Sequence, residues 1–295
     1  LKNLDEVEVE VFGLGGPEVS SLGISTPNGM KYQDLQVMGL VDPLLKLPKL
    51  LSIRKKLKAL FLNQKIDIFI GVDSPDFNMY FHKKLNGLGI KTIQVVSPSV
   101  WGWRENRIKA IGSYIDLTMC LFQFEHDYYL KKGFQTIKIP NAINIEKLNK
   151  LEDRRYQKQI IFAGRLSKEK GTETLLKICN DLDEELDLLI IGDGPEKEKF
   201  TNIQLKKKNI HFLGIQSHEK TISLIKGSDI LVQPSLSEGI STTLLEAMAC
   251  KTCIITSNVG GNLELIKNQE NGILIEPLDH KLFNKTINHM IQDKL

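Results

Sequence analysis

Short apolar runs rich in β-branched residues alternate with longer stretches of helical spacing along almost the whole chain. The helical stretches separate most of the runs at the spacing of strand–helix–strand units. Continuous apolar strands with intervening helices indicate parallel sheets that are covered on both faces. The runs that we predict as strands are residues 7–13, 66–73, 91–97, 116–122 and 136–140, then 159–164, 186–192, 209–214, 229–235, 252–257 and 272–277.

The number of predicted strands favours two α/β domains over one very large sheet. A length of 295 residues suits about two domains of roughly 150 residues each. We predict two doubly wound domains, residues 1–140 and 141–295, with the boundary in the polar segment 141–158. Ligands of open parallel sheets bind beyond the carboxyl ends of the strands, so two such domains facing each other would form a binding cleft.

Composition excludes several classes of protein. The 39 basic and 36 acidic side chains give a net charge of only +3, which by itself does not decide about nucleic acid. We predict no nucleic-acid partner. Four scattered cysteines are too few for a disulfide framework, which favours the cytoplasm. No run approaches the ~20 apolar residues of a membrane-spanning helix. Because the chain begins with Leu1 and enters a strand-like pattern at once, we expect it to be truncated, and we expect the same of its other end.

Two cations follow the strand predicted at 159–164. Arg165 and Lys170 lie just past its carboxyl end, and Gly164 and Gly171 allow tight turns on either side of them. Such a pair can form a clamp for an anion. The alternative is a solvated basic loop.

A second segment, 234–250, leads from a strand into a helix that should begin near Ser241. Glu238 precedes this helix, and Glu246 lies about two turns along it. The free amides of the first turn and the helix dipole favour a negatively charged ligand such as a diphosphate. Gly239 permits close approach of the backbone, and Ser241 and Thr242 offer hydroxyl groups. The alternative is an ordinary capped helix with one exposed glutamate.

Together these segments suggest a nucleotide-sugar site in which cations and amides, rather than a metal ion, neutralise the diphosphate. With its GR-x4-KG and Glu-x7-Glu patterns, the chain from about 138 to 295 resembles the retaining glycosyltransferases of family 4, also called group 1, which have the GT-B fold of two Rossmann-like domains. The resemblance implies a UDP-sugar donor, with Glu246 holding the ribose hydroxyls and Glu238 the transferred sugar. The donor-binding residues that we predict are Arg165, Lys170, Gly214, Ile215, Glu238, Gly239, Ile240, Ser241, Thr242 and Glu246.

In the first half, the apolar strand predicted at 66–73 carries Asp73 to its carboxyl end. A carboxylate in that position can accept a proton from an acceptor hydroxyl. The alternative is that Asp73 or Asp76 caps the helix that follows Pro75. Farther along, Trp101 and Trp103 stand in a loop beside Arg104, where they could grip a sugar or a phosphate or serve only for packing.

The first half resembles lipid-A-disaccharide synthase in GLGGPEVSSLG (13–23), IGVDSPDFN (70–78), GIKTIQVVSPSVWGWRENR (89–107) and the pair Phe124–Glu125. The resemblance implies an acylated glucosamine phosphate as acceptor, an N-acetylglucosamine-type sugar, and Asp73 as the catalytic carboxylate. We place Asp76, Trp101, Trp103 and Arg104 on the acceptor side. This family inverts the anomeric centre whereas group 1 retains it, so the stereochemical outcome stays open.

Residues 44–65 contain seven basic residues and no acidic one, with Leu50, Ile53, Leu57, Leu60 and Phe61 at helical spacing. A basic amphipathic helix of this kind can lie on an anionic membrane surface. The alternative is a helix that packs on the sheet with a solvated basic face. The two interpretations are compatible if only part of the apolar stripe is buried.

We therefore predict a UDP-sugar-dependent glycosyltransferase with a glycolipid acceptor, which acts in the cytoplasm or at the inner face of its membrane and needs no metal. Two alternatives are a sugar-nucleotide epimerase and an inactive fusion fragment that only binds nucleotide or membrane. Cys250 and Cys253 form a lone CxxC pair that we interpret as packing, because a structural zinc site normally needs four ligands.

Overall fold

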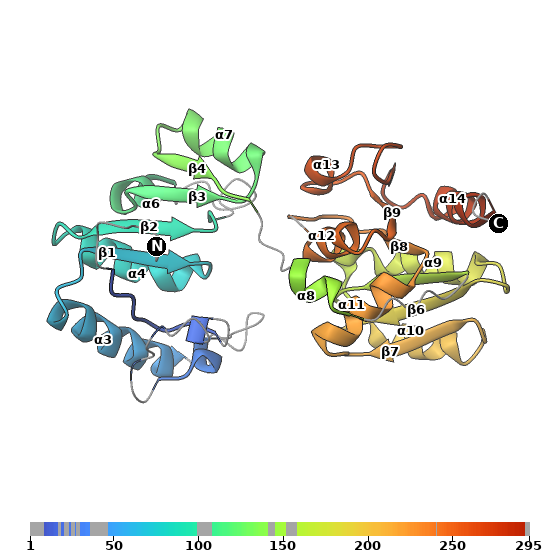
Figure 1. The fold of residues 1–295 in the computed structure, drawn as a ribbon, viewed down its shortest axis with the longest axis horizontal. Helices are drawn as coiled ribbons and strands as arrows, with labels where there is room; N and C mark the ends of the chain where they lie inside the picture. Colours follow the sequence, from blue (N-terminus) through green and yellow to red (C-terminus); the bar gives the residue numbers. More distant parts are fainter. Residues whose placement is uncertain are drawn as a thin grey trace. The chain divides into compact units, whose positions relative to one another are not determined.

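The structure is a computed structural model that describes residues 9–16, 19–20, 24, 27, 30–35, 47–98, 108–140, 145–151, 158–239 and 241–292. Its contacts divide the chain into two compact units (Figure 1). Unit 1 comprises Leu1–Cys120 and Glu125–Ile137, and unit 2 comprises Leu121–Phe124 and Lys138–Leu295. The domain boundary that we place between residues 140 and 141 stays a prediction.

Unit 2 contains a six-stranded sheet in the order β10-β9-β8-β5-β6-β7, and every strand pair in it is parallel. All six strands predicted for this half are confirmed. The order runs outward in one direction from β5 and in the other from β8, which is the doubly wound Rossmann arrangement. The strands are β5 (Gln159–Ala163), β6 (Asp187–Ile191), β7 (Ile210–Gly214), β8 (Ile230–Gln233), β9 (Cys253–Ser257) and β10 (Ile273–Ile275).

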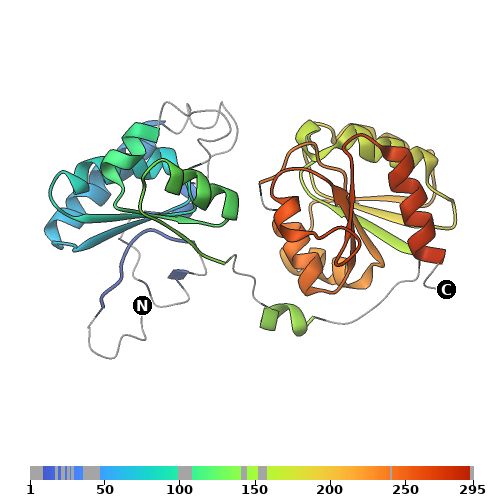
Figure 2. The same ribbon diagram turned by 90° about the horizontal axis from the view of Figure 1, so that it is seen from above.

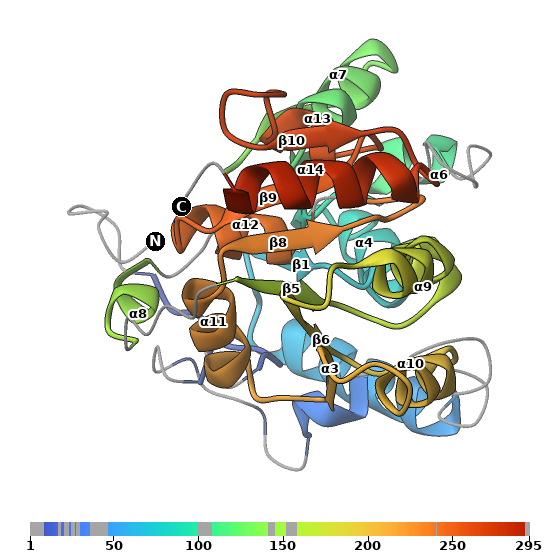
Figure 3. The same ribbon diagram turned by 90° about the vertical axis from the view of Figure 1, so that its right-hand side faces the viewer.

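Helices cover both faces of this sheet (Figure 2). One core cluster joins α9, α10 and α14 to the sheet, and Figure 3 shows α14 lying across that face. The other joins α11 and α12 to the opposite face. Burial on both faces explains why these strands are continuously apolar. The helices are α8 (Ile145–Asn149), η3 (Lys168–Lys170), α9 (Thr172–Asp181), α10 (Lys197–Gln204), α11 (His218–Gly227), α12 (Thr242–Ala249), α13 (Asn262–Leu265) and α14 (His280–Gln292).

Unit 1 contains a four-stranded sheet in the order β1-β2-β3-β4, and the pairs β1–β2 and β2–β3 are parallel. Four of the five predicted strands are confirmed. The elements are η1 (Tyr32–Leu35), α3 (Leu47–Asn63), β1 (Ile68–Val72), α4 (Pro75–Asn86), β2 (Lys91–Val95), α6 (Ile108–Tyr114), β3 (Leu117–Cys120), α7 (Gln123–Lys131) and β4 (Thr136–Lys138).

The predicted strand at 7–13 is wrong over its described part. Residues 9–13 form no strand, and only Phe12 makes a single bridge. Val9 and Val11 are 38% and 39% exposed, so the alternating pattern here does not bury an apolar face.

Helix α3 packs against α4 and β1 through the stripe Ile53, Leu57 and Phe61. The packing alternative is therefore confirmed for the centre of the apolar stripe. Among the described residues, no helix is both long enough and apolar enough to cross a bilayer.

At Gly171 the loop after β5 contacts the loop after β8. Its φ is +69°, and a Cβ built on it would lie 1.7 Å from the carbonyl oxygen of Pro234. The two loops thus touch backbone to backbone at the point where only glycine leaves room.

We predict that Gly171→Ala lowers the free energy of unfolding of unit 2 by more than about 2 kcal/mol, because a left-handed alanine alone costs about 1–2 kcal/mol and the clash adds to that cost. Urea unfolding measures the change. Gly214→Ala is the matched control, since Gly214 has a φ of +64° with nothing within 4 Å. Equal losses for the two variants would contradict the steric argument.

Candidate functional site

The carboxyl ends of β5 and β8 lie side by side at the point where the strand order of unit 2 reverses. In doubly wound sheets this is the switch point, where two loops diverge to opposite faces and leave space for a ligand. The predicted cations Arg165 and Lys170 follow β5, and the predicted Glu238 follows β8. The fold therefore places both predicted segments at the same edge of one sheet.

A largely buried ion pair connects these two loops. Nζ of Lys170 lies 2.7 and 2.8 Å from Oε1 and Oε2 of Glu238. The Glu238 side chain is only 5% exposed and that of Lys170 24% exposed. A carboxylate this buried is stable only when it is paired and hydrogen-bonded, as it is here.

Neutral side chains complete the shell of Glu238. Oγ of Ser235 and Nε2 of Gln233 donate to its Oε1 at 2.6 and 2.9 Å. In turn Oε1 of Gln233 accepts from Oγ of Ser241 at 2.9 Å. Gln233 thus links the glutamate to the residue that starts the next helix.

Ser241 is the N-cap of α12, as predicted, and its Oγ accepts from the amide of Leu244 at 3.4 Å. Thr242 opens the helix and is exposed, as is Gly239 before it. Ile240, also assigned to the donor site, lies outside the described residues. The other amides of the first turn and the helix dipole suit an anion at this end.

Arg165 is exposed on the loop after β5. Its charge acts on Glu169, whose pKa is lowered mainly by the nearby Ser167 side chain and by its own backbone amide, and further by Arg165 and Lys170. Lys170 instead directs its ammonium group to Glu238. The anion clamp of these two cations stays a prediction.

The second predicted glutamate has a partner that the sequence analysis missed. Oε1 of Glu246 lies 2.7 Å from Nε2 of His218, the first residue of α11. Gly214 is the last residue of β7, and Ile215, which is 74% exposed, begins the short loop before α11. A signal was present in the sequence, because His218 comes directly after this predicted base-side loop.

In unit 1, Asp73 follows β1 and its side chain is exposed. Ser74 occupies the N-cap position of α4, and Asp76 lies in the first turn of the helix. The capping alternative is therefore wrong for Asp73, and for Asp76 it stays a prediction. Trp101, Trp103 and Arg104, predicted on the acceptor side, lie outside the described residues.

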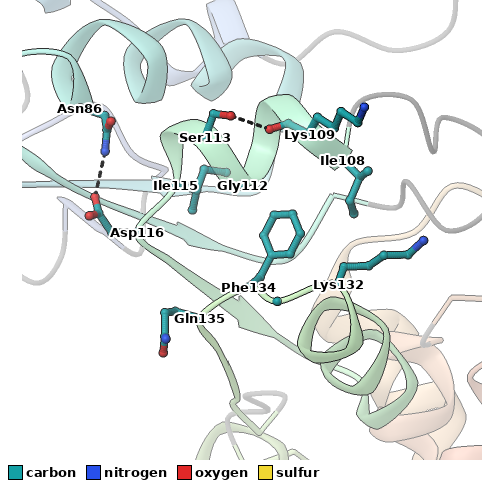
Figure 4. Close-up of a pocket in the computed structure, with 11 residues that line it drawn as sticks. Asn86, Ile108, Lys109, Gly112, Ser113, Ile115, Asp116, Lys132, Phe134 and Gln135 are labelled. Atoms are coloured by element: carbon teal, nitrogen blue, oxygen red, sulfur yellow. Dashed lines mark hydrogen bonds between the residues drawn. The ribbon is translucent and has the colours of Figure 1, made fainter.

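A pocket of about 700 Å³ lies in unit 1 beside α6 and the amino ends of β3 and β4 (Figure 4). Asp116 at its edge accepts hydrogen bonds from Asn86, Lys91 and the amide of Thr92. Burial raises the pKa of Asp116, but the bonds from Lys91 and Thr92 outweigh it and leave the pKa below its usual value. This carboxylate is occupied in holding strands together, and the pocket lies at the strand ends opposite to Asp73.

The described residues contain no cluster of three or more His, Cys, Asp or Glu side chains suited to a metal ion. All four cysteines are free, with Cys250 buried and Cys253 half-buried. The expectation that no metal is required stays a prediction.

Comparison with family models gives two matches. Residues 144–295 match Glycosyl transferases group 1, and residues 1–160 match Lipid-A-disaccharide synthetase. Each match covers more than half of the chain.

Curated relatives agree with the second match. The lipid-A-disaccharide synthase of Pseudoalteromonas translucida is 47% identical over 119 residues, which are 40% of this chain and 30% of the relative. That of Francisella philomiragia is 33% identical over 264 residues, which cover 82% of this chain and 66% of the relative. The chain thus spans about a third of the first of these relatives and about two thirds of the other.

Solved structures share the fold. Sucrose-phosphate synthase from Thermosynechococcus elongatus has a TM-score of 0.70 at 19% identity and covers 97% of this chain and 87% of its own. Anabaena HepE in complex with UDP and glucose has a TM-score of 0.69 at 15% identity, over 97% of this chain and 91% of its own.

We predict that Lys170→Met lowers the free energy of unfolding of unit 2 by about 3 kcal/mol, because it leaves the buried carboxylate of Glu238 without its counter-charge. The double variant Lys170→Met/Glu238→Gln should recover at least half of the loss, since it buries no unpaired charge. Urea unfolding of the two single variants and the double variant gives the coupling energy. Additive losses would show that the pair does not stabilise the loops.

Proposed function

Since the chain belongs to the Glycosyl transferases group 1 family through residues 144–295 and to the Lipid-A-disaccharide synthetase family through residues 1–160, we propose that it transfers a hexose from a UDP-sugar to a glycolipid acceptor. The sugar that we propose is of the N-acetylglucosamine type, and the acceptor is an acylated glucosamine phosphate. The observation that carries the proposal is the Lys170–Glu238 pair beside the start of α12 at the switch point of unit 2.

The donor diphosphate would bind at this switch point. Lys170 has three N–H groups, and Glu238 takes two of them, so one is left for a phosphate oxygen. Arg165 and the amides at the start of α12 would neutralise the remaining charge as UDP departs, without a metal ion. Glu246, held by His218, would accept from the ribose hydroxyls.

Glu238 would hold the transferred sugar. Its Oε1 already accepts from Lys170, Ser235 and Gln233, whereas Oε2 accepts only from Lys170 among the described residues. Because Oε2 accepts fewer hydrogen bonds than Oε1, it has room for a sugar hydroxyl.

Asp73 would act on the acceptor. It is exposed at the carboxyl end of β1, where a general base can take the proton of an attacking hydroxyl. With Asp73 as the base, attack opposite to the leaving UDP would invert the anomeric centre.

We predict that UDP release from UDP-N-acetylglucosamine requires an acylated glucosamine phosphate. Lys170→Ala should lower kcat/KM at least about 100-fold, as loss of one charge-stabilising group does elsewhere. Glu246→Ala should lower kcat/KM as well, because it removes the acceptor proposed for the ribose hydroxyls. Coupled detection of UDP measures turnover. Lys177→Ala and Glu270→Ala are the matched controls, because both side chains are exposed on other parts of unit 2. Wild-type turnover in the Lys170 and Glu246 variants would contradict the proposed donor site.

Two other outcomes would favour the alternatives. Conversion of the nucleotide sugar without any acceptor would indicate an epimerase. Binding of UDP in calorimetry with no turnover under any condition would indicate a chain that only binds its ligands.

We also propose that α3 contacts an anionic membrane surface from which the acceptor is taken. Leu47, Leu51 and Leu62 are 46%, 52% and 39% exposed, although the neighbouring stripe of the helix is buried. By helical spacing they share one face with Lys55 and Lys58. Exposed leucines interspersed with lysines suit an interfacial helix.

We predict that the protein binds vesicles containing phosphatidylglycerol and that Lys55→Glu/Lys58→Glu weakens this binding at least tenfold, since each cation near the surface contributes about 1 kcal/mol. Sedimentation with vesicles measures the partition. Lys206→Glu/Lys208→Glu is the control, because it reverses two exposed charges in unit 2. Equal binding by the two double variants would contradict a role for α3.

A further inference from the structure

The backbone takes a costly conformation where β1 and β2 end. Asp73 and Ser74 have φ angles of +49° and +39°, and Val96 at the end of the neighbouring strand has +67°. The left-handed region is unfavourable for residues with a Cβ, above all for a β-branched valine. Such conformations persist only where the surroundings hold them, and they gather at functional sites.

One buried side chain holds both strand ends. The amide nitrogen Nε2 of Gln94 donates to the carbonyl oxygens of Asp73 at 3.0 Å, of Val95 at 3.0 Å and of Val96 at 3.2 Å. Gln94 is fully buried within β2. It therefore fastens the backbone after β1 to the backbone after β2.

Two neighbours on α4 fix the position of this glutamine. Nδ2 of Asn78 donates to the same carbonyl of Asp73 at 2.6 Å. Nε2 of His82 lies 2.9 Å from Oε1 of Gln94. Gly71 leaves the room that they need, because a Cβ there would lie 2.8 Å from both Asn78 and Gln94.

The histidine is held in one neutral form. Oε1 of Gln94 can only accept, so Nε2 of His82 carries the proton. Its Nδ1 is buried and has no hydrogen-bond partner among the residues that the structure describes. Burial lowers the pKa of His82, while the bond to Gln94 opposes this in part. The imidazole thus serves as a fixed donor that orients the glutamine amide.

We infer that Gln94 is a positioning residue for Asp73: with Asn78 and His82 it holds the left-handed backbone that presents the Asp73 carboxylate at the carboxyl end of β1. The inference rests on the proposed function for the role of Asp73 as base. Asn78 and Gln94 contact Asp73 through its backbone carbonyl and not through its side chain. The carboxylate therefore stays exposed for an acceptor hydroxyl. Glycine at positions 73 and 74 would relieve the strain, and a turn with only a structural role would favour glycine there. That Asp73 and Ser74 occupy these positions instead supports a role for the side chain of Asp73.

The test is Gln94→Met, which keeps the length of the side chain and removes its hydrogen bonds. We expect kcat per folded molecule to fall at least tenfold while KM for the UDP-sugar changes less than twofold. We also expect the amides of Asp73 and Val96 to exchange hydrogen at least tenfold faster. Gln159→Met is the matched control, because Gln159 is a buried glutamine of unit 2 whose amide donates to Ser228.

Two further variants separate positioning from stability. In an Asp73→Asn background, Gln94→Met should cause no further loss of kcat, since both changes remove the same contribution. Adding Ser74→Gly to Gln94→Met should restore part of kcat by relieving the strain. If Gln94→Met does not fold, Asn78→Ala can replace it, because it removes the shorter hydrogen bond to the carbonyl of Asp73. We expect a smaller fall in kcat for Asn78→Ala, again with KM for the UDP-sugar nearly unchanged.

Unchanged kcat or unchanged exchange in a folded Gln94 variant would overturn the inference, and so would a further tenfold loss in the Asp73→Asn background. A chain that transfers no sugar at all would contradict the proposed function instead. Hydrogen exchange then still tests whether Gln94 stabilises the two strand ends. Faster exchange confined to the amides of Asp73 and Val96 would support this role of Gln94, and unchanged exchange would overturn it.

Discussion

The ion pair between Lys170 and Glu238 organises the candidate site. The two residues are 68 positions apart in the sequence, yet the reversal of strand order between β5 and β8 brings their loops together. Gly171 lets the backbones touch, and Gln233 extends the contact to the cap of α12. Cation, carboxylate and helix start therefore form one connected structure, and a diphosphate proposed to bind there would meet groups that are already in place.

Unit 1 holds its strand ends in a different way. There a neutral amide, that of Gln94, donates to three carbonyl groups. An uncharged anchor suits the role proposed for Asp73, because a buried cation close to this residue would stabilise its carboxylate and make it a weaker base. In unit 2 the buried ion pair leaves one N–H group of Lys170 for the proposed anion.

The pocket of unit 1 and the proposed chemistry are in different places. The pocket of about 700 Å³ lies at the amino ends of β3 and β4, whereas Asp73 follows the carboxyl end of β1. The carboxylate at the edge of that pocket, Asp116, accepts hydrogen bonds from Asn86, Lys91 and Thr92. The proposal therefore follows the topology of the sheets rather than the volume of a pocket, because the loops diverge at the carboxyl ends of parallel strands.

Local pattern determined much of this protein. Apolar runs specified all six strands of unit 2 and four strands of unit 1, and turn residues placed the start of α12 at Ser241, because periodicity and capping act within a few residues. The run at 7–13 failed because alternation alone does not ensure a buried face. Only the tertiary structure paired Lys170 with Glu238, His218 with Glu246, and Gln94 with Asp73, since strand order and long-range packing decide which distant side chains meet.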